Sequence, residues 1–199
     1  MSFQTIIDIS QSIEVNNRRT IGQQYSRSGQ VRVAQYLTAV PWVFTVKPHN
    51  FLYYPQVRNV IQAIDNADRQ VPELINFSST NLDWFTEMQG TATTASLATT
   101  PTANTQVLTL TSNGTFKAGD FIKLAGYVYK VTADSAGTTV NINRPLIGLP
   151  TSGTALTLGK NVSWNVVAEK CPTYILNPAP NGAFVEWSDD FIFREYITQ

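Results

Sequence analysis

The sequence has 199 residues, of which 43% are hydrophobic and 11% aromatic, so it can bury a substantial core and is not expected to be disordered. Charged residues make up only 14%, against about 25% in an average soluble domain. The 14 basic residues balance the 14 acidic ones and form no long basic run, which argues against sequence-specific binding of nucleic acid.

The cysteine content and the N-terminal sequence indicate the cellular compartment in which the protein folds. The single cysteine, Cys171, cannot form an internal disulfide, which argues against a disulfide-stapled secreted domain. The N-terminal run MSFQTIIDIS lacks the basic and then apolar pattern of a signal peptide. No apolar run approaches the ~18 residues of a membrane helix. We therefore expect a protein that is made and folded in the cytoplasm, with no membrane span.

Residues 1–90 form the first of three segments. The run QQYSRSGQVRVAQY at residues 23–36 has a Ser-Gly turn signal followed by alternating valines, which predicts a hairpin with one buried face. The densest basic group lies in and beside this run, and we interpret it as a solvated hairpin edge: Arg18, Arg19, Arg27 and Arg32. In residues 42–47, WVFTVK, large apolar residues occupy every second position between two prolines, which predicts a further strand.

After this strand, the spacing of apolar residues changes from every second position to that of an α-helix. Over Pro55–Ala67, apolar residues recur at i, i+3, i+4 and i+7: Val57, Val60, Ile61 and Ile64. Pro55 suits the first turn of a helix, and polar residues occupy the opposite face. A lone amphipathic helix cannot bury its apolar stripe by itself, so we expect this helix to lie against a sheet.

Residues 91–160 differ in composition, with 16 threonines. The segment opens with a small-residue run, TATTASLATTPTANT, that is typical of a linker. Short alternating strands separated by glycine-containing turns follow: Val107–Leu110, Phe121–Leu124, Tyr127–Val131, Val140–Ile142 and Ala155–Leu158. Several short strands at this spacing predict a small barrel or sandwich, inserted as a unit of its own.

Residues 161–199 return to the character of the first segment. Apolar residues alternate over 162–166, and an acidic turn at 188–190 separates the apolar runs 184–187 and 191–197, which predicts a closing hairpin. About 40 residues cannot fold alone. We therefore predict a mainly β fold with one amphipathic helix: a discontinuous β host domain, sandwich or barrel-like, from residues 1–90 plus 161–199, carrying an inserted small β-barrel at 91–160.

Residues suited to chemistry are few. His49 is the only histidine and has no nucleophile motif near it, so a hydrogen-bonding role is favoured over that of a general base. One histidine and Cys171 cannot supply the ligands of a common zinc site. Asp189 and Asp190 could form half of a carboxylate pair, but two aspartates between apolar runs are typical of a turn. We expect no catalytic, cofactor-binding or metal-binding residue, and hence no enzyme.

The aromatic residues after the strand at 42–47 suggest a contact surface. Phe51, Tyr53 and Tyr54 lie in a stretch too apolar for open solvent, and we predict them as interface residues. Such rings could also stack on sugars or bases. Their placement fits a core or a protein interface better.

Three features together resemble the distal-tail and baseplate structural proteins of tailed bacteriophages. They are the β pair SRSGQVRVAQYLTAVPWVFTVKP, the helix PQVRNVIQAIDNADRQ directly after it, and the closing FVEWSDDFIFREYI. The run GTFKAGDFIKLAGYVYKV resembles the start of the small barrels inserted in such proteins. The resemblance covers most of the chain's organisation, through structural motifs and not through an active-site signature.

The resemblance implies a virion tail protein in which β host domains form a ring around the tail tube, with six copies as the implied number. Its partners would be other copies of itself and other tail tube, hub or baseplate proteins. A ring subunit needs two different patches, because head-to-tail contacts are heterologous. The alternative function is a carbohydrate-binding or host-receptor-binding module of a virion, which would use exposed aromatic residues of the insert.

Overall fold

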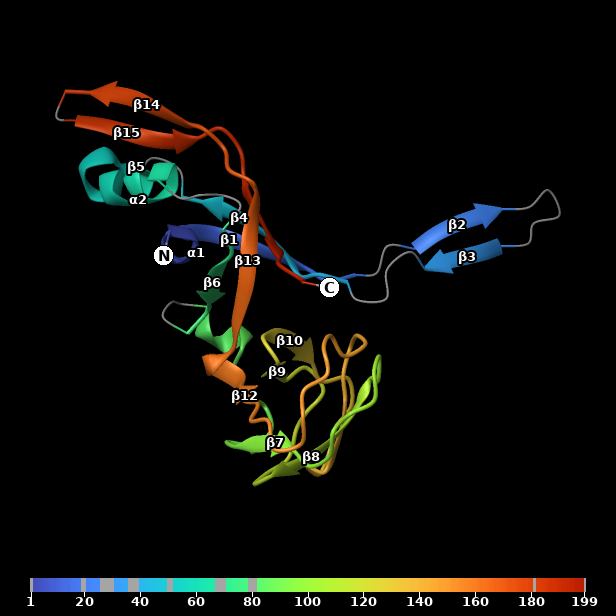
Figure 1. Ribbon diagram of the computed structural model, residues 1–199. Coiled ribbons are helices and arrows are strands. Elements are labelled where there is room, and N and C mark those ends of the chain that lie inside the picture. The colour runs from blue at the N-terminus through green and yellow to red at the C-terminus, as the bar shows by residue number, and fades with distance from the viewer. Residues whose placement is uncertain are drawn as a thin grey trace.

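The computed structural model describes residues 2–18, 21–25, 31–35, 40–49, 52–66, 71–78, 82–180 and 182–198 (Figure 1). The first elements are α1 (Ser2–Asp8), β1 (Ser10–Asn16), β2 (Ile21–Tyr25), β3 (Val31–Gln35), β4 (Val43–Pro48), β5 (Leu52–Tyr53), α2 (Tyr54–Asn66), β6 (Glu73–Asn76) and the 3-10 turn η1 (Asp83–Phe85). The others are β7 (Ala95–Leu97), β8 (Val107–Ser112), β9 (Phe121–Leu124), β10 (Tyr127–Lys130), β11 (Thr139–Asn141), β12 (Thr157–Leu158), the 3-10 turn η2 (Gly159–Asn161), β13 (Ser163–Lys170), β14 (Tyr174–Ala179), β15 (Gly182–Trp187) and β16 (Phe191–Glu195). The predicted mainly β class is confirmed.

Five strands form the main sheet, in the spatial order β1-β4-β16-β13-β6, with every neighbouring pair antiparallel. The strands come from both ends of the chain, and the sheet curls around an aromatic core. The Trp164 ring lies at the centre of this core, with centroid distances of at most 6.4 Å to five other rings: Trp42, Phe44, Phe77, Phe85 and Phe121. The alternation predicted over residues 42–47 and 162–166 is confirmed, because the residues expected on one face are all buried: Trp42, Phe44, Val46, Val162, Trp164 and Val166.

Two helices cover part of this core. In α2 the predicted stripe is buried, and the helix packs mainly against α1 and β15 instead of the main sheet. Helix α1 was not predicted. Its apolar residues Phe3, Ile6 and Ile7 follow helical spacing and are buried, with Phe3 stacked on Phe193 at a centroid distance of 4.9 Å. Tertiary packing therefore decides the conformation of a seven-residue segment rich in β-branched residues.

The predicted closing hairpin is wrong. Strands β15 and β16 flank the acidic turn at 188–190, but they belong to different sheets. β16 joins the main sheet between β4 and β13, whereas β15 pairs with β14 and β5 in a small sheet of order β14-β15-β5. The hairpin partner of β15 is β14, and the turn at 188–190 carries the chain from one sheet to the other.

Residues 92–158 form a small barrel of two three-stranded sheets, β10-β9-β12 and β11-β8-β7. Isolated bridges join the sheets at both edges, since Ser96 pairs with Ala155 and Val131 pairs with Ile142. The five strands predicted for the segment are present. The opening run 91–105 is not simply a linker, because it contains β7, whose residues Ala95 and Leu97 are buried in the barrel core.

The barrel has a hydrophobic core of its own and also contributes to the first core. Its core lies between Ala92 and Leu158, and Phe121 and Val128 pack instead into the core of the main sheet. Asp120 fixes the entrance to the barrel, because its buried carboxylate accepts hydrogen bonds from the backbone N–H groups of Gln89 (2.7 Å), Gly90 (3.1 Å) and Lys117 (2.8 Å). That the insert folds as a separate domain stays a prediction.

A buried ion pair joins the barrel to the main sheet. Arg144 of the barrel forms two hydrogen bonds with the carboxylate of Glu195 on β16, Nη1–Oε2 at 2.6 Å and Nη2–Oε1 at 2.7 Å, and both side chains are 2% exposed. The same guanidinium donates to the carbonyl oxygens of Val40 (2.8 Å) and Val128 (2.7 Å), while the Trp42 N–H donates to Glu195. The pair is thus desolvated, and the Nη1 and Nη2 groups of Arg144 and both Glu195 oxygens have hydrogen-bond partners, whereas Arg144 Nε is buried without one among the described residues.

Candidate interaction surfaces

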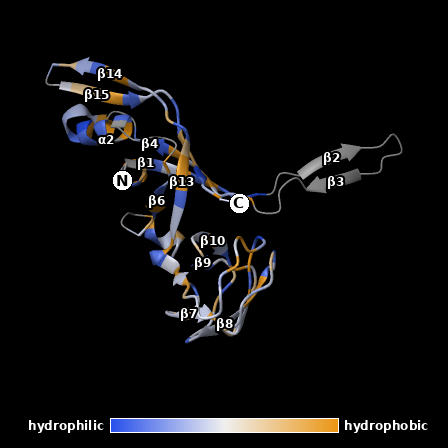
Figure 2. Ribbon diagram, viewed as in Figure 1, coloured by the Kyte–Doolittle hydropathy of each residue, from blue (hydrophilic) through white to orange (hydrophobic). Residues whose placement is uncertain are grey.

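The largest concentration of exposed apolar residues in the described part of the chain lies on β14. Its first three residues, Tyr174, Ile175 and Leu176, are exposed by 36% to 49%, and Phe184 on β15 is 38% exposed. Apolar and polar residues lie side by side along this hairpin (Figure 2). A run of exposed apolar residues on one strand is unusual for a surface that stays in water.

The strand register explains why β14 is apolar on both faces. Leu176 pairs with the buried Val185 of β15, the strand that α2 contacts, so the two side chains lie on the same face of the small sheet. Ile175 is on the opposite face and pairs with Glu186. Among the described residues no strand pairs with the outer edge of β14, so its backbone and both faces are open.

The structure separates two of the three predicted interface residues, Tyr53 and Tyr54. Tyr53, on β5, pairs with Phe184, and the centroids of their rings are 6.0 Å apart, so Tyr53 belongs to the β14-β15-β5 sheet. Tyr54 begins α2 and packs against the core of the main sheet. Phe51 lies outside the described residues.

Sequence reasoning missed β14 and its pairing with β15. The signal that could have revealed it is the dipeptide Asn181-Gly182, since Asn-Gly between apolar runs is the strongest short-range indication of a hairpin. Gly182 also has φ +148° and lies against the Tyr53 ring, where an added Cβ would be 2.5 Å from a ring carbon. Tyr53 therefore packs directly on the glycine that begins β15.

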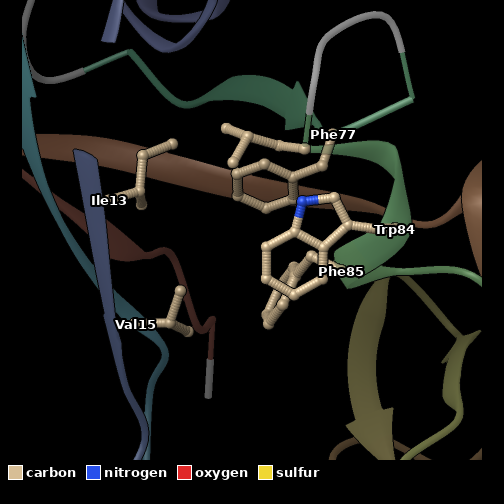
Figure 3. A pocket seen from close by; sticks show the side chains of 6 residues that line it. Ile13, Val15, Phe77, Trp84 and Phe85 are labelled. Carbon is tan, nitrogen blue, oxygen red and sulfur yellow. The ribbon is translucent and has the colours of Figure 1, made fainter. Parts of the chain in front are cut away.

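A second apolar feature is a slot at the edge of the main sheet (Figure 3). It has a volume of about 60 Å³, several times the roughly 10–15 Å³ that one water molecule needs. Ile13 and Val15 line one side from the edge strand β1, and aromatic residues line the other. The complete lining is Ile13, Val15, Phe77, Leu82, Trp84 and Phe85. We call this feature the slot.

Charged residues flank Trp84 of the slot lining, whereas Glu14 of β1 lies on the opposite face of its strand from Ile13 and Val15. Lys160 bridges two carboxylates on either side of Trp84, with its Nζ 3.0 Å from Asp83 Oδ2 and 3.3 Å from Glu87 Oε1. The hydrogen bond from Lys160 lowers the pKa of Asp83, so this carboxylate is ionised at neutral pH. Glu14, between Ile13 and Val15 on β1, is exposed. The elements that form the slot thus carry three carboxylates and one ammonium group.

The residues considered for chemistry are dispersed. His49 is exposed at the end of β4, with its backbone N–H bonded to Ile9, and Cys171 is half-buried against the core of the main sheet. Asp189 forms an ion pair with Lys170 and accepts a hydrogen bond from the N–H of Asp190, as in a turn. Within the described ranges no three histidine, cysteine or carboxylate side chains are grouped to hold a metal ion.

Both tyrosines of the barrel, Tyr127 and Tyr129, pack in or against its hydrophobic core. Tyr129 is fully buried beneath the Arg144 guanidinium, 5.2 Å from its ring centroid, and burial raises its pKa to about 12. Tyr127 is half-buried, and its hydroxyl is hydrogen bonded to Thr198. The ring of Tyr129 therefore has no open face on which a sugar could stack.

Comparison with protein-family models and with the sequences of curated proteins finds no match. In the part of the chain that the structure describes, no helix has both the length and the apolar character needed to cross a membrane.

Proposed function

We propose that this protein is a structural subunit that acts by assembling with copies of itself, in a ring at or around the tube of a bacteriophage tail or baseplate. The observation that carries the proposal is the open β14 strand, with Tyr174, Ile175 and Leu176 exposed on it. The location in a phage tail or baseplate is suggested by the three sequence features that resemble distal-tail and baseplate proteins.

Leaving such a strand exposed to water is unfavourable. An exposed apolar edge strand promotes non-specific pairing, and proteins that stay monomeric protect such edges with charges, prolines or bulges. No charged residue or proline interrupts Tyr174–Leu176, and the proline of β14, Pro178, lies beyond this run. Burial of one Ile or Leu side chain contributes about 1.5–3 kcal/mol, so a neighbouring copy that covers this strand would gain substantially from Ile175 and Leu176.

A ring requires two different contact surfaces on each copy. The β14-β15-β5 sheet and the slot lie on different elements, so each copy can offer different patches to its two neighbours. Such head-to-tail contacts close into a ring when the rotation between copies closes. The low charge density of the chain suits neighbouring copies, because their surfaces can approach without strong repulsion.

The first test is the mass of the purified protein by size-exclusion chromatography with light scattering. We expect a mass several times that of the 22.0 kDa chain, and ring-shaped particles in electron micrographs. A protein that remains monomeric at every concentration would overturn the proposal and favour the receptor-binding or carbohydrate-binding alternative. Closed dimers without a central opening would overturn the ring.

A matched pair of variants tests the role of β14. Leu176→Asp places a charge on the strand and should shift the protein toward monomers. Leu149→Asp makes the same change on a barrel leucine that is 65% exposed, and should leave the mass unchanged. Both variants should keep the wild-type circular dichroism, since neither side chain is buried. Equal effects of the two changes would show that β14 has no special role.

A further inference from the structure

We propose that β14 of one copy pairs with the edge strand β1 of the next copy, so that the main sheet of one subunit continues into the β14-β15-β5 sheet of its neighbour. The added strand covers the slot beside β1 with the exposed apolar side chains of β14. This inference rests on the proposed function, because it names how neighbouring copies of an assembling subunit meet. Strand addition of this kind draws its affinity from main-chain hydrogen bonds and its specificity from alternate side chains.

The edge of the main sheet at β1 is open, whereas the opposite edge is covered. Among the described residues β1 pairs only with β4. At the other edge, Gln4 of α1 takes the place of a further strand on β6, because its side-chain amide donates to the Asn76 carbonyl (3.1 Å) and accepts from the Asn76 N–H (2.8 Å). An incoming strand therefore finds unpaired backbone groups at β1 and not at this end of β6.

Backbone groups of Ile13 and Val15 point out from the open edge of β1. The Glu195 N–H donates to the carbonyl of Trp42, directly before β4, at 2.7 Å, so Trp42 directs its backbone groups toward β16. Because backbone groups alternate between the two sides of a strand, Phe44 also bonds β16 and directs none toward β1. Its cross-strand partner Val15 therefore directs its N–H and C=O groups away from β4, as does Ile13 two residues earlier.

β14 is open in the same way. The Ser188 N–H donates to the Thr173 carbonyl at 2.9 Å, in register with the pairing of β14 and β15. Alternation from Thr173 directs the backbone groups of Ile175 toward β15 and those of Tyr174 and Leu176 outward. Each of the two edges thus offers two residues, separated by one, whose N–H and C=O groups have no strand partner among the described residues.

Antiparallel pairing of the two edges in one register joins Leu176 to Ile13 and Tyr174 to Val15. Side chains directly opposite each other in such a pair lie on the same face of the sheet. Ile13 and Val15 line the slot, with Trp84 across from them (Figure 3). Pairing through the outward backbone groups therefore places Leu176 and Tyr174 on the slot side, where they cover the exposed indole.

The two strands also match in polarity. The slot is apolar, and Leu176 and Tyr174 are 45% and 36% exposed on β14. β14 has no charged residue, and Glu14 of β1 lies on the face away from the slot, so the contact buries no charge there. Pro178, which has no N–H to donate, falls opposite Gln11, which is left out of the pairing of β1 with β4. The pairing thus ends where neither strand could continue it.

Disulfide cross-linking tests this register. In the proposed pairing Glu14 lies opposite Ile175 as a non-hydrogen-bonded pair, in which Cα atoms are about 4.5 Å apart and a disulfide can form. The variants are Glu14→Cys and Ile175→Cys, each combined with Cys171→Ser. An equimolar mixture treated with oxidised glutathione should give a covalent dimer on a non-reducing gel. A single chain with both substitutions should give a ladder of covalent oligomers.

The controls exclude other contacts. Glu14→Cys alone should give no covalent dimer, and neither should Leu149→Cys mixed with Ile175→Cys, although Leu149 is 65% exposed. Ile175→Cys alone should also stay unlinked. A strong homodimer of Ile175→Cys would show that β14 pairs with β14 of the second copy, because that pairing places the two residues 175 opposite each other, and it would overturn the inference.

Trp84 gives a readout of the slot itself. It is 65% exposed, whereas the three other tryptophans are buried, so it dominates fluorescence quenching by acrylamide. Cross-linking of the mixture should reduce this quenching, and Trp84→Phe should remove most of the change. A covalent dimer with unchanged quenching would mean that the added strand does not cover the slot, which contradicts the inference.

The outcomes separate the inference from the proposed function. If the wild type assembles and the mixture of Glu14→Cys with Ile175→Cys gives no covalent dimer, the strand pairing is wrong and the structural function stands. A wild type that is monomeric at every concentration overturns both.

Discussion

Removal of one partner from the buried Arg144–Glu195 pair should be among the most destabilising single substitutions in this protein. Arg144→Met leaves the Glu195 carboxylate, 2% exposed, with the backbone N–H of Trp42 as its remaining donor among the described residues, and withdraws a donor from the Val40 carbonyl. Breaking a buried ion pair in this way costs about 3–5 kcal/mol in the free energy of unfolding. Glu195→Leu should cost a similar amount, because it leaves the guanidinium charge buried.

The double variant Arg144→Met with Glu195→Leu should cost much less than the two single changes added together. It buries no charge and fills the site with apolar side chains. The remaining loss comes from the Val40 carbonyl and the Trp42 N–H, at about 1–3 kcal/mol for each unsatisfied group. We therefore expect a loss of roughly 2–6 kcal/mol, against roughly 6–10 kcal/mol for the sum of the single changes.

The measurement is urea unfolding followed by circular dichroism and by tryptophan fluorescence. The pair Arg194–Glu169 is a matched control, since it lies beside Glu195 in sequence and both of its side chains are 46% exposed. Arg194→Met should cost less than about 1 kcal/mol, as for most surface ion pairs. If the buried and exposed pairs behaved alike, or if the buried changes were additive within about 0.5 kcal/mol, the reasoning would be refuted.

Three further changes test the fold. Ile61→Ala should lower the free energy of unfolding by about 2–5 kcal/mol, and the exposed neighbour Gln62→Ala by less than about 0.5 kcal/mol; equal losses would contradict the packing of α2. Burial raises the pKa of Tyr129 to about 12, so the folded protein holds this proton more tightly than the unfolded chain does. The free energy of unfolding should therefore fall above pH 10, by about 1.4 kcal/mol at pH 11. If Tyr129→Phe shows the same decline in an unfolding series, the assignment is wrong. Replacement of residues 91–160 by a Gly-Ser linker should leave a folded but less stable remainder, since Phe121 leaves the first core; complete loss of the near-ultraviolet circular dichroism would contradict an inserted domain.

Some features of this protein follow from its sequence because they depend on local periodicity. Alternation with a period of two fixes which residues of a strand share a face, and this identified the buried residues at 42–47 and 162–166. Spacing near 3.6 did the same for the stripe of α2. Short strands between glycine turns predicted five of the six barrel strands, and β7 was missed because it lies in a run of small residues.

Other features depend on which distant segments meet, and only the tertiary structure decides them. A turn signal shows where a chain reverses but not which strand becomes the neighbour, so the acidic turn at 188–190 led to the wrong hairpin. The candidate surfaces are non-local as well. The slot joins Ile13 to Phe85, and the buried pair joins Arg144 to Glu195 across 51 positions. The openness of the β14 edge results from the absence of an outer neighbour among the described residues, and no periodicity of the strand itself encodes this.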